Sequence, residues 1–172
     1  QQPPTTWRDL LVQPLEVLNE NTPHLARAQS GLASNDDPSG VLVGAGSLGS
    51  ALAMLWGRAG YGLWTVVDKD HIRPHNLSRH TAEADQIGQS KAAAVALLQA
   101  WADHGAGPMT SLVASASDPQ RKDVLGALRT ADWVVDASAS LDYPRYASTL
   151  EGVARHVSAF FTPSAGSAIA LV

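Results

Sequence analysis

The glycine-rich turn Gly44–Gly49 limits the possible folds of this chain more than any other feature of its sequence. The turn reads Gly-Ala-Gly-Ser-Leu-Gly, follows the apolar run Val41–Val43 and opens a helix-length segment. In that setting Gly44 and Gly46 let backbone amides and the positive end of a helix face an anionic ligand, whereas Gly49 lets helix and strand pack closely. The motif predicts a β-α-β unit that binds a mononucleotide or a dinucleotide. The alternative is a tight turn that binds nothing.

Short β-rich runs alternate with helix-length segments from Val41 onward. Strands are expected at residues 41–43, 63–67, 111–114, 133–135 and 157–161. Helices are expected at residues 48–59, 89–103, 119–128 and 143–155. Parallel strands need a crossover segment between them, so this alternation predicts an α/β fold: a doubly wound, Rossmann-like, mainly parallel sheet with helices on both faces.

The first expected helix carries an apolar face. Its members recur at helical spacing and are Leu48, Leu52, Leu55, Trp56 and Ala59. This face is expected to pack on the sheet, and Gly60 can supply the C-terminal turn. Trp56, Trp64 and Trp133 lie inside periodic segments rather than loops, so we interpret them as core or interface residues rather than as a stacking platform.

Residues 1–40 differ from the rest and are expected to form an N-terminal appendage to a single domain of residues 41–172. Prolines punctuate two short helical patterns here. Thr22 and Pro23 provide a cap and a first-turn proline for a helix over residues 24–33, and residues 34–40 have the composition of a loop. At the other end, the apolar run of residues 167–172 resembles a sheet cut mid-course, which favours a fragment of a longer protein.

Charge and composition exclude several classes of function. A net charge of −4 without a basic block argues against nucleic-acid binding. The chain has no cysteine, so disulfides, thiolate zinc sites and thiol nucleophiles are excluded from it, and any thioester chemistry must lie elsewhere. No signal peptide is apparent, and the apolar stretch of residues 92–102 is too short to span a bilayer. We expect a soluble, cytoplasmic protein without a membrane partner.

An acidic residue, Asp68, ends the second β-rich run nineteen residues after Gly49. An acid at this place can accept hydrogen bonds from both ribose hydroxyls, which fits NAD and ATP equally. The next segment separates the two cofactors, because it carries Asp68-x-Asp70, Asn76-Leu77-x-Arg79 and Gly88-x-x-Lys91. A nicotinamide enzyme has no use for this series.

These spacings resemble the ubiquitin-activating-enzyme superfamily, which includes the ThiF, MoeB and HesA adenylyltransferases. The resemblance runs from about Val41 to Asp136. It implies an ATP-binding adenylation domain that activates the C-terminal carboxylate of a ubiquitin-like protein and releases pyrophosphate. The segment Pro74–His80, with His80 where glutamine is commoner, is most similar to the activating proteins of bacterial anti-phage and ubiquitination-like operons. A glycine-ending ubiquitin-like partner, a homodimer or pseudo-dimer and a conjugating enzyme are the partners implied.

The resemblance also assigns roles to individual residues. It makes Asp68 the ribose ligand, Asn76 and Arg79 contacts to the phosphates, Lys91 a second cation on the triphosphate, and Asp136 the magnesium ligand. Arg79, Lys91 and Asp136 are the expected catalytic set. The nucleotide-binding set comprises Gly44, Ala45, Gly46, Gly49, Asp68, Asp70, Asn76, Arg79 and Lys91. An attacking carboxylate and a triphosphate repel each other, so fixed cations and a metal ion fit the chemistry.

Each of these residues has a simpler interpretation. Arg79 alone would be a solvated loop residue, Lys91 a solvent-facing lysine on an alanine-rich helix, and Asp136 a helix cap. The histidines at 71, 75 and 80 suggest a metal site, yet zinc is disfavoured because thiolate partners and helical His-x-x-x-His spacing are missing. In the family an arginine before the first strand reaches the partner's ATP, and the candidates for it are Arg27 and Arg8.

Two other functions stay open at this point. A nicotinamide-dependent oxidoreductase domain would bind NAD at the same glycines, but it would leave Asn76, Arg79 and Lys91 without a role. An inactive scaffold that pairs with an active subunit is the non-enzymatic alternative. The retention of Asp68, Arg79, Lys91 and Asp136 argues against it, because such halves typically lose the phosphate-binding set.

Overall fold

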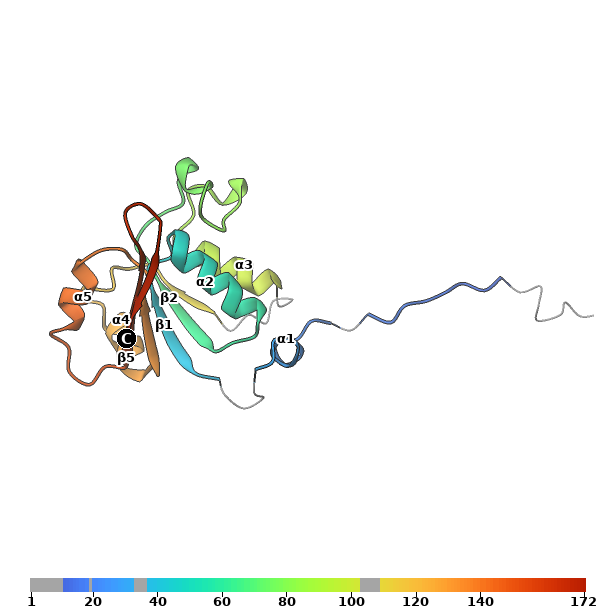
Figure 1. Ribbon diagram of the computed structural model, residues 1–172, viewed down its shortest axis with the longest axis horizontal. Helices are drawn as coiled ribbons and strands as arrows, with labels where there is room; N and C mark the ends of the chain where they lie inside the picture. The colour runs from blue at the N-terminus through green and yellow to red at the C-terminus, as the bar shows by residue number, and fades with distance from the viewer. Residues whose placement is uncertain (1–10, 19, 33–36, 103–108) are drawn as a thin grey trace, which may run out of the picture.

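The computed structural model describes residues 11–18, 20–32, 37–102 and 109–172, and in this part of the chain six strands form one sheet (Figure 1). Their order is β3 (Thr110–Leu112), β2 (Leu63–Val67), β1 (Ser39–Val43), β4 (Trp133–Asp136), β5 (Arg155–Phe161) and β6 (Ala168–Leu171). The first five strands are parallel, and β6 pairs antiparallel with β5. The predicted mainly parallel sheet is therefore confirmed.

Helices cover both faces of the sheet (Figure 1). One face carries α2 (Ser47–Arg58) and α3 (Lys91–Ala102), and the other carries α4 (Lys122–Thr130) and α5 (Asp142–Ala147). Strand residues alternate between the two cores, because Leu42 packs with the α2 and α3 side whereas Val41 and Val43 pack with the α4 and α5 side. The doubly wound, Rossmann-like α/β prediction is correct.

The buried face of α2 differs from the predicted one. Its buried residues are Gly49, Ser50, Ala53 and Gly57, whereas Leu55 is 60% exposed. Large side chains do not fit on this face, because a Cβ at position 49 would collide with the carbonyl oxygen of Gly44 and one at position 57 with Gln99. The helix lies so close to its neighbours that small residues form the contact, and the flanking Leu48, Leu52 and Trp56 are only partly buried. Gly60 does supply the C-terminal turn, with φ of +63°.

We expect Gly49→Ala to lower the free energy of unfolding by about 1–3 kcal/mol, because the new methyl group collides with backbone rather than with a movable side chain. Gly126→Ala on α4 is the matched control. Its Cβ meets nothing within 4 Å, so it should raise the free energy of unfolding by about 0.5–1 kcal/mol through helix propensity. Urea unfolding measures both. Equal effects of the two substitutions would contradict the close contact between α2 and Gly44.

Several helix boundaries differ from the sequence predictions. The helix expected over residues 143–155 ends at Ala147, since Gly152 adopts φ of +68° and β5 begins at Arg155. The helix expected from residue 119 begins at Lys122. In the N-terminal region α1 (Pro23–Gln29) has the predicted cap, with the Leu25 amide donating to Thr22 Oγ1 at 3.2 Å. It ends before residue 33 because Gly31 takes φ of +71°.

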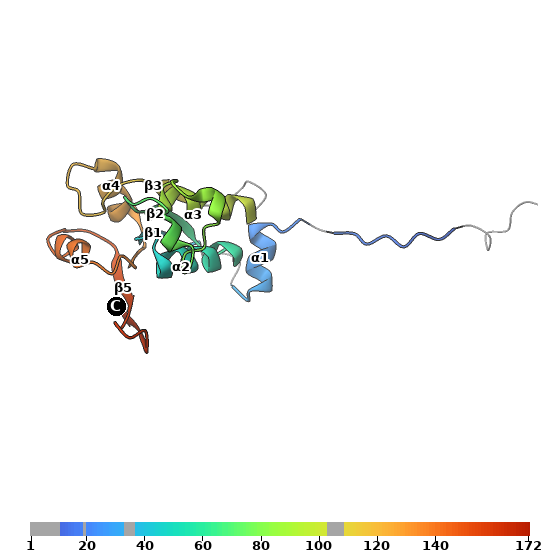
Figure 2. The same cartoon turned by 90° about the horizontal axis from the view of Figure 1, so that it is seen from above.

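The second helical pattern expected in residues 1–40 does not form a helix in the described residues 11–18 and 20–22. Figure 2 shows residues 11–18 running away from the domain as extended chain. Leu11, Val12, Leu15, Val17 and Leu18 are all at least 80% exposed there. Among the described residues, no helix combines the length and the apolar character needed to cross a bilayer.

Candidate functional site

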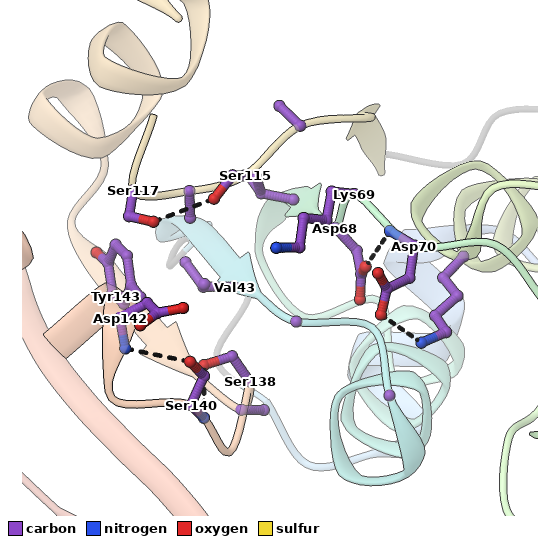
Figure 3. A pocket seen from close by; sticks show the side chains of 17 residues that line it. Val43, Asp68, Lys69, Asp70, Ser115, Ser117, Ser138, Ser140, Asp142 and Tyr143 are labelled. Atoms are coloured by element: carbon purple, nitrogen blue, oxygen red, sulfur yellow. Dashed lines mark hydrogen bonds and ion pairs between the residues drawn. The ribbon is translucent and has the colours of Figure 1, made fainter. Parts of the chain in front are cut away.

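A cavity of about 230 Å³ opens at the carboxyl ends of the parallel strands. It lies where the strand order reverses between β1 and β4, which is the place where open α/β sheets bind ligands. The loops after β1, β2, β3 and β4 all contribute to its lining. Figure 3 shows Asp68 and Asp70 on one side of Val43, and Ser138, Ser140 and Tyr143 on the other. The carboxyl ends of four adjacent strands, β3, β2, β1 and β4, therefore meet at this cavity.

The glycine-rich turn forms part of this cavity. Gly44 has φ of +89°, and a Cβ there would lie 2.6 Å from the Cα atom of Ser138, so the fold itself requires this glycine. Gly46 differs, because a Cβ there meets nothing within 4 Å although the residue lines the cavity. Gly46 also caps α2 without a side-chain hydrogen bond, and the first amides of a helix have no intrahelical acceptor. The turn thus offers amides and open space to an anionic ligand.

Asp68 holds this turn in place. Its Oδ2 accepts a hydrogen bond from the Ala45 amide and its Oδ1 accepts one from the Asp70 amide, both at 2.7 Å. Ala45 is fully buried, and its carbonyl oxygen lies 2.7 Å from Nε2 of His80. Ala45 was expected to contact the nucleotide, but in this structure the protein itself uses both of its backbone groups. Gly49 likewise acts by close packing beneath Gly44 rather than by lining the cavity.

Lys91 forms an ion pair with Asp70 at the edge of the same cavity. Its Nζ lies 3.0 Å from Asp70 Oδ2, and its side chain is only 13% exposed although it begins α3. The hydrogen bond from Lys91 lowers the pKa of Asp70, and partial burial opposes that shift. The solvent-facing interpretation of Lys91 is therefore wrong. The ion pair with Asp70 holds the ammonium group of Lys91, and Lys91 also lines the first cavity.

A second cavity of about 300 Å³ adjoins the first through Lys69, Asp70 and Lys91. Its remaining lining residues are His71, Arg73, His75 and Asn76. Asn76 is buried, and its Oδ1 accepts the Arg73 amide at 2.9 Å. Since Lys91 neutralises Asp70, the cationic groups Lys69 and Arg73 leave this cavity positive, and it can accept an anionic group that extends from the first one.

Arg79 lies outside both linings and is exposed. Its neighbour His80 is buried against the glycine-rich turn through Ala45. Arg79 therefore belongs to a loop that His80 fastens to the turn, although no contact of the Arg79 side chain with the turn is present in the described residues. The structure brings Gly44, Gly46, Asp68, Asp70 and Lys91 into one cavity and leaves Arg79 outside it.

Asp136 lies at the end of β4, only 5% exposed and outside the lining of the cavity. Its Oδ1 accepts the Ser138 amide at 3.0 Å, so it stabilises the turn that follows β4 rather than capping a helix. The carboxylate that does line the cavity on this side is Asp142, the first residue of α5 (Figure 3). Asp136 at the end of β4 is therefore the deeper carboxylate, and Asp142 at the start of α5 is the one that lines the cavity.

Arg27 does not extend toward a partner in this structure. It is 5% exposed, forms an ion pair with Asp37 and contacts Gly60 at the end of α2. This position is at the amino ends of the strands, opposite to the glycine-rich turn. The role of Arg27 as an arginine that reaches a partner's ATP stays a prediction, and Arg8 lies outside the described residues.

Comparisons with known proteins identify the family of this chain. The model of the ThiF family matches residues 29–149. The chain belongs to the ThiF family. Over 57 residues it is 46% identical to the adenylyltransferase and sulfurtransferase MOCS3 of Caenorhabditis briggsae, an alignment that covers 33% of this chain and 14% of that protein.

Solved structures related to this ThiF-family chain share its fold. The E. coli tRNA N6-threonylcarbamoyladenosine dehydratase TcdA matches with a TM-score of 0.61 and 23% identity, over 71% of this chain and 51% of its own. E. coli MccB, crystallised with MccA-N7isoASN, matches with a TM-score of 0.59 and 16% identity, over 72% and 36%. TcdA has also been crystallised with ATP, with a TM-score of 0.57 to this chain. The chain spans about half or less of the length of these relatives.

Some lining residues of this ThiF-family cavity escaped the sequence analysis. Ser115 and Ser117 follow β3, with their hydroxyl oxygens 3.1 Å apart, and Ser138 and Ser140 follow β4. Tyr143 is buried on α5, and its hydroxyl lies 2.8 Å from His156 Nε2. Burial raises the pKa of Tyr143. The available signal was their position just after predicted strands, where the ligands of parallel sheets bind.

Among the described residues, no three or more histidine and carboxylate side chains gather closely enough to hold a metal ion. His80 instead joins two backbone segments, while His71 and His75 line the second cavity. Magnesium does not need such a group, because it usually binds through one or two carboxylates with phosphate oxygens and waters. Asp142, which lines the cavity, and the deeper Asp136 at the end of β4 are carboxylates that fit that mode of binding.

Proposed function

We propose that this ThiF-family chain binds ATP and catalyses the adenylation of the C-terminal carboxylate of a ubiquitin-like protein. The observation that carries the proposal is the joining of Gly46, Asp68 and Lys91 in one cavity at the strand ends. An open amide turn, a carboxylate for the ribose and a held ammonium suit a nucleoside triphosphate better than NAD. The ATP complex of TcdA supports this choice of nucleotide.

In the proposed reaction, a carboxylate oxygen of the partner attacks the α-phosphorus of ATP. The bond between the α-phosphorus and the bridging oxygen breaks, and pyrophosphate leaves with the electron pair, so an acyl-adenylate forms. The amides of the turn and the ammonium of Lys91 stabilise the phosphate charge, and Arg79 approaches it from the adjoining loop. Catalysis then rests on positioning and electrostatics, since no nucleophilic side chain is needed.

Asp136 at the end of β4 and Asp142 at the start of α5 would hold magnesium. Bound there, the ion would supply positive charge to the phosphate oxygens. Asp68 would accept hydrogen bonds from the ribose while keeping the turn in its shape. We retain Asn76 and Asp70 in the proposed nucleotide-binding set, because they line the adjoining cavity beside Lys91.

The identity of the partner is the most specific part of the proposal. The names of the relatives span an adenylyltransferase and sulfurtransferase, a tRNA N6-threonylcarbamoyladenosine dehydratase and MccB crystallised with MccA-N7isoASN, so family membership alone does not select a substrate. The segment Pro74–His80 supports a partner encoded in a bacterial ubiquitination-like or anti-phage operon. A dimer, a conjugating enzyme and a cytoplasmic location belong to the same proposal.

Pyrophosphate–ATP exchange with magnesium and candidate partners that end in glycine tests this function. Exchange that depends on the partner's free carboxylate supports it, and calorimetry with NAD in place of ATP separates the oxidoreductase alternative. If the chain binds ATP but shows no pyrophosphate–ATP exchange with any candidate partner, the result would favour the inactive-scaffold alternative.

Gly46→Ala is expected to preserve folding, since its Cβ has open space, but to weaken ATP binding on the order of 10-fold or more by placing a methyl group in the cavity. Calorimetric titration with ATP measures the loss, and the thermal unfolding midpoint checks the fold. Unchanged ATP affinity in folded Gly46→Ala would contradict the placement of phosphate on this turn.

A further inference from the structure

The ring of His80 is buried between the glycine-rich turn and the loop that leads to α3. Its Nε2 lies 2.7 Å from the carbonyl oxygen of Ala45, and its Nδ1 accepts a hydrogen bond from the Ala82 amide at 2.9 Å. A carbonyl oxygen only accepts, so Nε2 carries a proton; an amide only donates, so Nδ1 carries none. The neutral imidazole with its proton on Nε2 is therefore the form that satisfies both contacts.

These contacts join the two parts of the proposed phosphate site. Ala45 is held on one side by Asp68, which accepts its amide, and on the other by His80, which binds its carbonyl oxygen. The amides of Arg79 and His80 both donate to the carbonyl oxygen of Asn76 at 2.9 Å. The loop over residues 76–82 is thus one hydrogen-bonded unit, and the His80 ring fastens it to the turn. The Thr81 amide adds a longer contact of 3.3 Å to Ser50 Oγ.

We propose that His80 is a positioning residue whose neutral ring holds Arg79 and Asn76 at the phosphate-binding turn, so that ATP binding and adenylation weaken when the ring gains a proton. This inference rests on the proposed function. A protonated ring would place a second N–H against the Ala82 amide, leaving that buried donor without its acceptor. The loop carrying Arg79 would then lose its fixed position relative to the turn.

The surroundings of His80 favour the neutral ring at neutral pH. Burial lowers the pKa of His80 below its ordinary value of 6.5, and the nearby charge of Lys91 acts in the same direction. The contact with Ala45 and the charge of Asp68 oppose the shift. Because the folded-state pKa is lowered, the stabilising contribution is fully present above pH 6.5 and is lost as the pH falls from there through the folded-state pKa.

Two substitutions at position 80 separate the hydrogen bonds from the titration. His80→Gln can donate to Ala45 and accept from Ala82 without taking up a proton, whereas His80→Ala removes both contacts. His24→Gln on α1 is the matched control, since His24 is exposed and far from the turn. Calorimetry measures ATP affinity from pH 7.5 to 5. The nucleotide's own titration affects every variant equally, so the ratio of wild-type to His80→Gln affinity is the readout.

We expect that ratio to fall on the order of 10-fold toward pH 5, with His80→Ala weak at every pH and His24→Gln matching wild type. Nitrogen-15 NMR of the ring should show the proton on Nε2. A ratio that does not change with pH, or a proton on Nδ1, would overturn the inference while leaving the proposed function intact. If wild type binds no ATP at pH 7.5, the proposed function fails, and the role of His80 fails with it.

Discussion

Lys91→Met is expected to lower pyrophosphate–ATP exchange on the order of 10²–10³-fold while the domain stays folded. Lys91 and Lys69 both line the two cavities, but Lys69 is exposed, whereas the Lys91 side chain is only 13% exposed, so water screens it less than a surface lysine. Methionine keeps most of the buried stem. The remaining partner, Asp70, is 57% exposed and can be solvated, so stability should change by about 1 kcal/mol or less.

The control for this prediction is Lys122→Met, at the exposed start of α4 and away from both cavities. It should leave exchange and the unfolding midpoint unchanged. Arg79→Ala is expected to show a loss in the same direction as Lys91→Met, because both would act on phosphate charge. Undiminished exchange in both Lys91→Met and Arg79→Ala would refute the assigned phosphate site.

Local sequence signals were sufficient for the five parallel strands and their order along the chain, but not for the antiparallel β6. The β-rich runs from Val41, Leu63 and Trp133 became β1, β2 and β4 with nearly the expected bounds, because buried parallel strands are continuous apolar runs. Helix ends were less predictable. The helix α5 is shorter than predicted because β5 already begins at Arg155. The start of β5 depends on pairing with β4 and not on helix propensity.

The orientation of α2 shows why burial could not be predicted from hydrophobicity alone. Leu55 belongs to the apolar stripe, yet it is exposed because the helix approaches the sheet through Gly49, Ala53 and Gly57. The sequence contained those small residues at helical spacing. Their role in close packing depends on the carbonyl oxygen of Gly44 and the side chain of Gln99, which lie against them in the fold.

For the candidate site, residues tied to a strand end were predictable, and residues whose direction depends on tertiary contacts were not. Asp68 and Lys91 line the cavity as their positions after β2 and at the start of α3 suggested. The ion pair of Arg27 with Asp37 was not predicted, because it forms between segments that carry no joint sequence signal. Asp142 was missed because α5 begins several residues after β4, at a place fixed by the intervening turn.

The two carboxylates after β4 lead to the second prediction. Replacing both Asp136 and Asp142 with asparagine should lower magnesium-dependent exchange on the order of 10²–10³-fold, since magnesium depends on charged oxygen ligands. Asp142→Asn alone should lose more than Asp136→Asn, because only Asp142 lines the cavity. Asparagine at position 136 can still accept the Ser138 amide, so the turn after β4 should persist.

Exchange measured against magnesium concentration distinguishes a lost ligand from a damaged fold. A lost ligand raises the magnesium concentration needed for half-maximal exchange, whereas a distorted turn lowers the rate at every concentration. Asp118→Asn, in the loop before α4 and outside the cavity lining, is the charge-matched control. If Asp136→Asn alone removes the magnesium dependence and Asp142→Asn has no effect, the metal ion binds at the deeper carboxylate, and the cavity lining is a poor guide to the ligands.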